Sequence, residues 1–305
     1  MLFAVRRVLG LVLVAVLCAF SPVLAHEKTD GGVILAKSAG DKRGLLWKVK
    51  SSTGTVWLFG SIHLASEEMY PLPEKAEAAF AGADNLVVEV NAGPGLAHMM
   101  MSKGSYPAHE SLTDHISDEI HGQLARYMEE EGMPAEAFDR FEPWLVALRI
   151  SVMELQKLGL DPQLGVEQHF IAKADGKPIL ELETAEDQLS LFDDLADELQ
   201  EQMLKKTLLE IDRIADEVDA MIDAWSSGDT AAMETLMYKS LEEAPELAPL
   251  FKKLFTDRNL TMTEKIAGFL ETDSSYFVLV GAGHLVGDDG IVALLKKKKF
   301  SVKRH

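Results

Sequence analysis

Two short segments near opposite ends of the chain share one pattern: a hydrophobic run, a glycine and, three residues later, a histidine. The first reads Val-Trp-Leu-Phe-Gly-Ser-Ile-His-Leu over residues 56–64, and the second reads Phe-Val-Leu-Val-Gly-Ala-Gly-His-Leu over residues 277–285. Such runs of branched and aromatic residues favour buried strands. A strand that ends in Gly-x-x-His brings an imidazole to the edge of a sheet, where ligands of open α/β sheets bind. We therefore expect His63 and His284 to share a site.

The segments around these motifs predict an α/β fold with a central mixed sheet built from two βαβ-like halves. Residues 45–50 and 55–59 alternate as strands around a Ser-Ser-Thr-Gly turn, which predicts a hairpin. The first half continues with a helix over 74–83 and a strand over 85–90. The second half consists of a strand over 276–280, a helix over 290–297 and a strand over 300–303.

A large helical insert over about 110–270 separates the two halves, and we expect residues 44–305 to form a single domain. Apolar residues recur there at helical spacing, as at Leu189, Phe192, Leu195 and Leu199. One strand, over 178–183, interrupts the helices. The expected helices cover about 114–131, 143–158, 165–174, 185–204, 208–225, 230–241 and 260–271.

The beginning of the chain differs from the rest. Arg6 and Arg7 precede an apolar run over 8–20, and a small residue, Ala25, completes a cleavage-site pattern. This is typical of a secretory signal peptide over 1–25, followed by a flexible leader over 26–43. We expect an exported protein, in a bacterial periplasm or outside the cell. Membrane association would arise only if the N-terminal segment stayed uncleaved.

Cysteine usage and charge exclude several function classes. The single cysteine, Cys18, lies in the expected signal peptide, so the mature protein has no thiol for catalysis, zinc binding or a disulfide. The formal net charge of −19 opposes the binding of nucleic acid, whose phosphates are also negative. A basic run at 296–299 is best explained as the exposed end of a helix.

Side chains suited to metal binding or proton transfer follow the predicted strands. His63 follows the first parallel strand, Glu89 lies in the second, Glu181 and Glu183 end the third, and His284 follows the fourth. Two imidazoles and a carboxylate at one sheet edge suit a divalent ion, which activates water. A buried Glu89 is also explained by pairing with an arginine, and Glu183 by capping the next helix.

Arg258, expected between helical stretches, is the candidate positive partner, either for a carboxylate or for an anionic intermediate; an ordinary surface role is the alternative. The His-Glu-x-x-His, Gly-x-Ser-x-Gly and Walker motifs of other enzymes are missing from the sequence.

Several short segments, taken together and in order, resemble the TraB/GumN family, which includes YbaP-like bacterial proteins and the animal Tiki proteins. The similar stretch runs from about Leu45 to Arg304. Position 167 is Glu where many members have Asp. The segments are 60–64, 69–73, 86–89, 143–144, 165–167, 182–184 with Gln188, 258–259 and 280–285 with Gly287.

The resemblance implies an α/β core with a helical insert and a metal-dependent hydrolase site. It assigns His63, Glu89 and His284 as metal ligands, with Glu183 and Arg258 in support. Tiki proteins are metalloproteases that use manganese or cobalt, so the resemblance favours those metals, with zinc as an alternative.

Three functions follow as hypotheses. The first is an exported metal-dependent hydrolase, above all a peptidase, that attacks a peptide or a small ester or amide; Glu89 or Glu183 would then transfer protons. The second is a module that binds and sequesters a peptide such as a pheromone without cleaving it. The third is a metal-free, esterase-like hydrolase with a histidine as general base.

Overall fold

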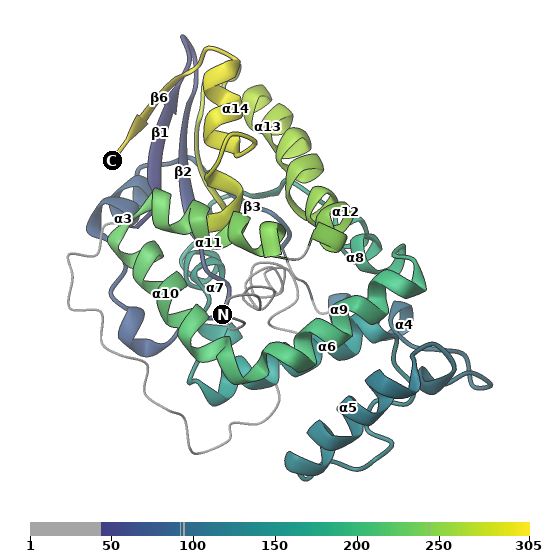
Figure 1. Ribbon diagram of the computed structural model, residues 1–305. Coiled ribbons are helices and arrows are strands. Elements are labelled where there is room, and N and C mark those ends of the chain that lie inside the picture. Colours follow the sequence, from purple (N-terminus) through teal and green to yellow (C-terminus); the bar gives the residue numbers. More distant parts are fainter. Residues whose placement is uncertain (1–43, 92, 94, 244) are drawn as a thin grey trace.

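The computed structural model describes residues 44–91, 93, 95–243 and 245–305. The expected signal peptide and leader lie outside these residues. A six-stranded sheet forms the centre of the fold, with helices on both of its faces and beyond one of its ends (Figure 1). Within the part of the chain that is described, no helix combines the length and hydrophobicity that a membrane crossing requires.

The sheet has the strand order β4-β3-β5-β2-β1-β6 and confirms the predicted α/β class. β1 and β2 form the predicted antiparallel hairpin, whereas β2, β5, β3 and β4 run parallel. The last strand, β6, pairs with β1 at the opposite edge from β4. The strands are β1 (Leu46–Lys50), β2 (Thr55–Ser61), β3 (Asn85–Val88), β4 (Ile179–Glu181), β5 (Ser275–Gly281) and β6 (Ser301–Arg304).

The two Gly-x-x-His motifs lie side by side because β2 and β5 are neighbours. Gly60 pairs with Val280 and Ser61 pairs with Gly281, so the two glycines differ by a single step of register. Both histidines therefore follow their strands at the same edge of the sheet. β3 flanks β5 on its other side, and Glu89 follows its last residue. β5, the last of the four parallel strands in the sequence, thus occupies the centre of the site.

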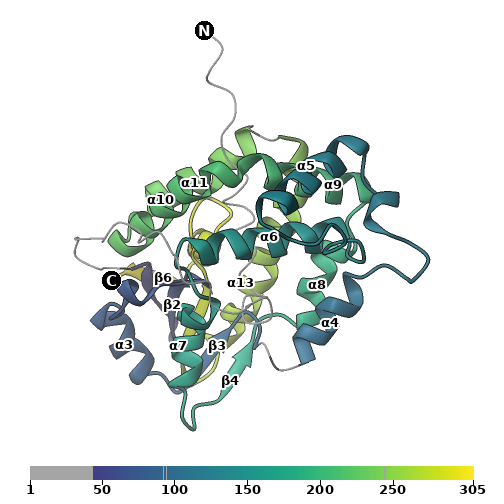
Figure 2. The same ribbon diagram turned by 90° about the horizontal axis from the view of Figure 1, so that it is seen from below.

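Helices cover the two faces of the sheet. α3 (Glu74–Ala81) and α7 (Val166–Ala172) lie on one face, where Phe80 and Phe170 pack against Phe277. α13 (Arg258–Phe269) and α14 (Ile291–Lys297) lie on the other face (Figures 1 and 2). The central strands β2, β3 and β5 are consequently buried on both sides, as expected of parallel strands without polar alternation.

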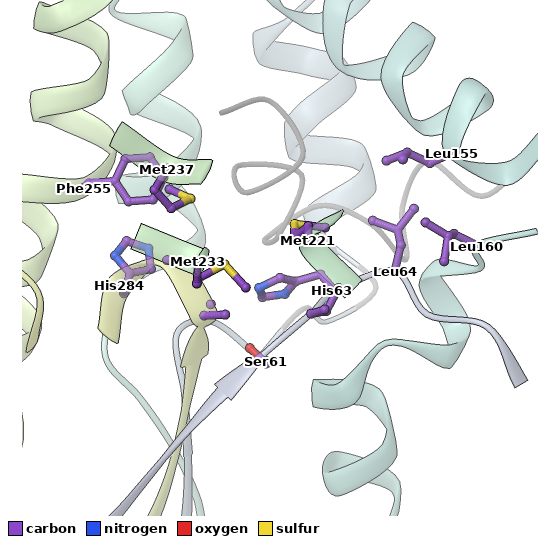
Figure 3. A pocket seen from close by; sticks show the side chains of 14 residues that line it. Ser61, His63, Leu64, Leu155, Leu160, Met221, Met233, Met237, Phe255 and His284 are labelled. Carbon is purple, nitrogen blue, oxygen red and sulfur yellow. The ribbon is translucent and has the colours of Figure 1, made fainter. Parts of the chain in front are cut away.

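The helices of the insert extend beyond the carboxyl ends of the parallel strands (Figures 1 and 3). α6 buries most of its length, including the fully buried Trp144. The insert consists of α4 (Gly95–Lys103), α5 (Asp118–Glu130), α6 (Pro143–Lys157), α7, α8 (Ala185–Asp193), α9 (Asp197–Glu210), α10 (Ile214–Ser227), α11 (Thr230–Glu243), α12 (Ala248–Phe251) and α13.

Several helical predictions need correction; for example, α9 (Asp197–Glu210) runs through the gap expected between 204 and 208. The helix expected over 185–204 breaks after α8, because Ala196 is extended (φ −60°, ψ 144°) and two acidic residues begin α9. The helix α4 was not predicted. Arg258 does not lie between helical stretches; a π-helical segment, Lys252–Asp257, joins α12 to α13 without interruption and leads directly into Arg258.

Candidate functional site

The candidate site lies beyond the carboxyl ends of β2, β5 and β3. His284 lies in a 3-10 turn, Ala282–Leu285, directly after β5. A Cβ atom on Gly281 would lie 3.3 Å from His63 Nε2 and 3.5 Å from both Glu89 Oε1 and His284 Cδ2. The three predicted metal ligands therefore surround one small space above Gly281. Figure 3 shows both imidazole rings at the strand ends, facing the same cavity.

A buried cluster of charges lies beneath this space. Arg258 Nη2 donates to Glu89 Oε2 at 2.6 Å and to Glu183 Oε2 at 2.6 Å, and Arg258 Nε donates to Glu183 Oε1 at 2.9 Å. Gln188 Nε2 donates to Glu183 Oε2 at 2.9 Å. The backbone N–H of Gly281 donates to Glu89 Oε1 at 2.6 Å. One arginine thus pairs with two carboxylates, away from water.

This cluster fixes the charge of Glu89. Burial alone would raise the pKa of the Glu89 carboxyl, but Arg258, the two imidazoles and the Gly281 N–H together lower that pKa to about 2. The two carboxylates, in turn, raise the pKa of Arg258 despite its burial. Glu89 is therefore an anion at neutral pH, as a metal ligand must be.

Glu183 has a different role from the helix cap that its position allowed. The cap of α8 is Thr184, whose hydroxyl accepts the N–H of Asp187 at 3.1 Å. Both oxygens of Glu183 bond to Arg258 instead. The neighbouring Glu181 is exposed and accepts the N–H of Asn91 at 2.6 Å, away from the histidines.

His284 is held by Asn259, the residue after Arg258 on α13. Asn259 Nδ2 donates to the carbonyl of Asp289 at 2.9 Å, which leaves Asn259 Oδ1 as an acceptor for His284 Nδ1 at 2.6 Å. This network assigns the proton of His284 to Nδ1 and a lone pair to Nε2. Burial and the Arg258 charge lower the pKa of His284 to about 3, so the ring is neutral at physiological pH.

The orientation of His284 has a direct chemical consequence. Its Nε2 atom lies 3.9 Å from Glu89 Oε1. Both atoms are acceptors, because one bears a lone pair and the other belongs to an ionised carboxylate. Two acceptors that face each other in a buried space attract a group that satisfies both of them, either a cation or a donor.

His63 is held by a carboxylate from another part of the chain. Its Nδ1 atom lies 3.0 Å from Oε1 of Glu167, in the first turn of α7. Gly165 allows this approach, since a Cβ there would lie 2.4 Å from the carbonyl oxygen of His63. Val166 N also donates to the carbonyl of Ile62 at 3.0 Å. The Nδ1 atom of His63 thus lies beside the Glu167 carboxylate, and its Nε2 atom lies at the space above Gly281.

Sequence reasoning gave no roles to three residues of this site: Glu167, Gln188 and Asn259. Each lies in a segment that carries the family resemblance, but none follows a parallel strand. The available signal was position relative to a predicted site residue. Asn259 follows Arg258, Gln188 lies five residues after Glu183, and Glu167 lies two residues after a glycine at a helix start.

The donors fit a divalent ion in type and direction. His63 Nε2, Glu89 Oε1 and His284 Nε2 are ligands that zinc, manganese and cobalt accept. Nitrogen and oxygen ligands at about 2.1 Å from a tetrahedral ion lie ~3.4 Å apart, so the 3.9 Å between His284 and Glu89 is somewhat wide. Among the described residues, no three His, Cys, Asp or Glu side chains are grouped as closely as a formed metal site.

Comparisons with known proteins identify one family and several relatives. The TraB/PrgY/gumN family matches residues 45–304. The uncharacterised protein YbaP of Escherichia coli is 28% identical over 78% of this chain and 87% of its own length. A metalloprotease TIKI homologue of the sponge Amphimedon queenslandica is 22% identical over 85% of this chain and 61% of its own length. An uncharacterised protein of Treponema pallidum is 19% identical.

No solved structure matches the chain significantly. The family match covers nearly all of the described residues and includes both Gly-x-x-His motifs, Glu89, Glu183 and Arg258. The chain therefore belongs to the TraB/PrgY/gumN family.

Proposed function

We propose that this protein is a metal-dependent hydrolase that cleaves peptide bonds, with His63, Glu89 and His284 as the ligands of a divalent ion. The observation that carries the proposal is the pair of acceptors, His284 Nε2 and Glu89 Oε1, which face each other at 3.9 Å above Gly281. The similarity to a metalloprotease TIKI homologue supports the same reaction class. The resemblance favours manganese or cobalt as the metal.

A divalent ion at this position would polarise a carbonyl group and supply a water nucleophile at neutral pH. The protein itself contributes orientation and charge. Glu167 and Asn259 each hold one imidazole by Nδ1, which turns both Nε2 atoms toward the space above Gly281. Arg258 keeps Glu89 ionised and in place.

Neither Glu183 nor Glu89 is the proton carrier in this proposal. Both oxygens of Glu183 are bonded to Arg258, and Gln188 also donates to one of them, so Glu183 is a positioning residue in this proposal. Glu89 shares its oxygens between Arg258 and Gly281. Breaking either arrangement to move a proton would leave a buried charge without its partner.

One observation favours a second candidate, a metal-free hydrolase. The pair of Glu167 and His63, at 3.0 Å, has the arrangement of a general base that is oriented by a carboxylate. In this candidate His63 Nε2 accepts a proton from water or from a substrate hydroxyl. The peptide-sequestering function is the third candidate, and it predicts binding without products.

We further propose that the protein acts outside the cytoplasm, in the periplasm or at the cell exterior. The support is the basic, apolar and small-residue pattern of residues 1–25. Fractionation of cells, together with the N-terminal sequence of the mature protein, tests this part: an N-terminus near residue 26 in an exported fraction is expected, and an intact N-terminus in the cytoplasm would contradict it.

The test of the reaction compares metal content with cleavage. Wild-type protein, His63→Ala, His284→Ala and the control His169→Ala are stripped with a chelator and reloaded with Mn²⁺, Co²⁺ or Zn²⁺. His169 pairs with Glu77 at 2.6 Å, outside the site. Bound metal is measured by mass spectrometry of the elements, and peptide products by mass spectrometry of the digests.

We expect the wild type and His169→Ala to bind metal and to cleave peptides only when loaded, and both site variants to lose metal and activity. Full turnover after exhaustive chelation, abolished by His63→Ala, would overturn the proposal in favour of the general-base hydrolase. Peptide binding without products would overturn it in favour of the sequestering module.

A further inference from the structure

A cavity with one polar end and apolar walls adjoins the two histidines. Its polar end, at the strand edge, consists of Ser61, His63 and His284. The walls come from helices of the insert and from the loop after β2 (Figure 3). Their principal side chains are Leu155, Leu160, Met221, Met233, Met237 and Phe255.

Three methionines form the middle of this wall, and we call them the methionine wall. Met221 lies on α10, and Met233 and Met237 lie one turn apart on the same face of α11. All three are buried. Methionine is unbranched and flexible, so such a wall adapts to the shape of an inserted apolar group.

The methionine wall contacts the turn that carries His284. A Cβ on Gly283 would lie 2.8 Å from Cε and 3.0 Å from Sδ of Met237, so Met237 packs directly against the backbone beside the histidine. Phe255 also packs against the His284 ring, with 5.2 Å between the ring centroids. A group that occupies the cavity therefore lies next to the candidate site.

The charge of the lining selects among side chains. Over the described residues, the cavity is lined without any Lys, Arg, Asp or Glu side chain. A charged side chain inserted there would lose its hydrating water without gaining a charged partner. A short apolar side chain would not reach the methionine wall and would gain few contacts. An apolar side chain that reaches the wall satisfies both conditions, and because the cavity measures only about 30 Å³, the flexible methionines would move to admit it.

We propose that this cavity is the specificity pocket of the enzyme, and that its substrates are peptides with an apolar side chain next to the cleaved bond. The inference rests on the proposed hydrolase function and adds the substrate class. An acyl chain of an ester has the same shape and polarity, so it is the alternative source of the same apolar group.

The experiment uses a set of peptides that differ at one position, occupied by norleucine, leucine, alanine, glutamate or lysine, together with short-chain and medium-chain acyl esters. The metal-loaded wild type is compared with Met233→Ala, Met237→Ala and the control Met203→Ala. Met203 on α9 is as deeply buried but lies outside the cavity. Thermal unfolding shows which variants fold.

We expect kcat/KM for norleucine to exceed that for alanine by about tenfold or more, because each methylene group counts in an apolar pocket, with glutamate and lysine lowest. Met233→Ala and Met237→Ala should reduce the norleucine preference, and Met203→Ala should preserve it. If the alanine variants fail to fold, the double variant Met233→Leu/Met237→Leu conserves volume and should shift the preference from norleucine toward other shapes.

A second measurement separates this inference from the proposed function. Peptide binding is measured by calorimetry in His63→Ala/His284→Ala, with and without Met237→Ala. Norleucine-dependent binding that Met237→Ala weakens in this inactive variant would support the pocket. The same binding to the metal-loaded wild type, without any cleavage products, would support the pocket and contradict the hydrolase. Cleavage without any side-chain preference would overturn the pocket and leave the hydrolase intact. Chain-length selectivity among esters alone would overturn the peptide assignment.

Discussion

The two Gly-x-x-His motifs share one pattern and end neighbouring strands, but their histidines have different partners. His63 Nδ1 faces a carboxylate, Glu167 of α7, on one face of the sheet. His284 Nδ1 faces an amide, Asn259 of α13, on the other face. A carboxylate partner increases the basicity of an imidazole, whereas an amide chiefly fixes its orientation. The two motifs thus place two imidazoles at one sheet edge, but the Nδ1 atom of one lies beside a carboxylate and that of the other beside an amide.

The glycines of the two motifs differ in the same way. A Cβ on Gly60 would lie 3.0 Å from Leu45 Cβ and 3.2 Å from Ala282 Cα, within the packed core. A Cβ on Gly281 would project among the three polar donors. One glycine therefore serves packing, and the other keeps the candidate ion space open.

The largest expected effect comes from breaking what the two histidines share, the Arg258 cluster. Arg258→Ala leaves Glu89 and Glu183 as buried carboxylates without their cation, which should lower the free energy of unfolding by about 3–5 kcal/mol. Urea denaturation measures the change. Lys103→Ala removes a more exposed pair with Asp193 and should lower it by only about 0–1 kcal/mol. Equal losses in the two variants would contradict a special role for the cluster.

The paired glycine variants should have opposite effects. Gly60→Ala forces overpacking and should lower the free energy of unfolding by about 1–3 kcal/mol while metal affinity persists. Gly281→Ala adopts an allowed backbone conformation (φ −49°, ψ 137°) and should unfold near the wild-type temperature but bind no metal. Calorimetric metal titration and thermal unfolding of both variants decide the matter. If Gly281→Ala bound metal normally, the ion would lie elsewhere.

Removal of the Glu167 charge tests whether the carboxylate beside His63 strengthens metal binding. Glu167→Gln keeps the shape of the side chain but loses its charge, so metal affinity should fall by about 10–100-fold. The control is Glu77→Gln, which changes the pair with His169 outside the site. Affinities come from competition with a chelating dye. Unchanged affinity in Glu167→Gln would show that the partner serves only the fold.

The smallest effect concerns Tyr70, which supports the segment before Glu167. Its hydroxyl donates to the carbonyl of Leu164 at 2.6 Å, and burial, with the nearby Glu167 and Glu77 charges, raises its pKa to about 12. Tyr70→Phe should lower the free energy of unfolding by about 1 kcal/mol at neutral pH.

The same variant should also change how the free energy of unfolding falls at alkaline pH. Tyrosine in the unfolded chain ionises near pH 10, whereas folded Tyr70 keeps its proton to about pH 12. The unfolded state therefore binds fewer protons in that window, and stability falls as the pH rises through it. Denaturation series from pH 9 to 12 should show a shallower loss in Tyr70→Phe. Parallel curves for the two proteins would contradict the assigned burial.

Much of the sheet could be predicted from local pattern, because the runs at 55–61 and 275–281 are strongly β-favouring and end at glycines. The strand order could not be predicted in this way. β5 lies between β2 and β3, although more than a hundred residues separate it from either of them in the sequence. That placement is decided by packing on both faces, which no local signal reports.

The candidate site likewise combines residues that the local sequence predicts with residues that only the packing of helices brings in. His63, Glu89 and His284 follow strand ends and were predictable, and the structure brings them to one space. Glu167 comes from a helix on one face and Asn259 from a helix on the other, and their contacts depend on how those helices pack. The break in the helix over 185–204 escaped prediction because Leu195 keeps the apolar spacing although the backbone at Ala196 is extended.

The most direct test of the account is a crystal structure of the manganese-soaked protein, with anomalous diffraction data to locate the metal. The account predicts a single strong anomalous peak above Gly281, within ligand distance of His63 Nε2, Glu89 Oε1 and His284 Nε2. A peak at another position, or a well-ordered site with both imidazoles in place and no peak, would contradict it.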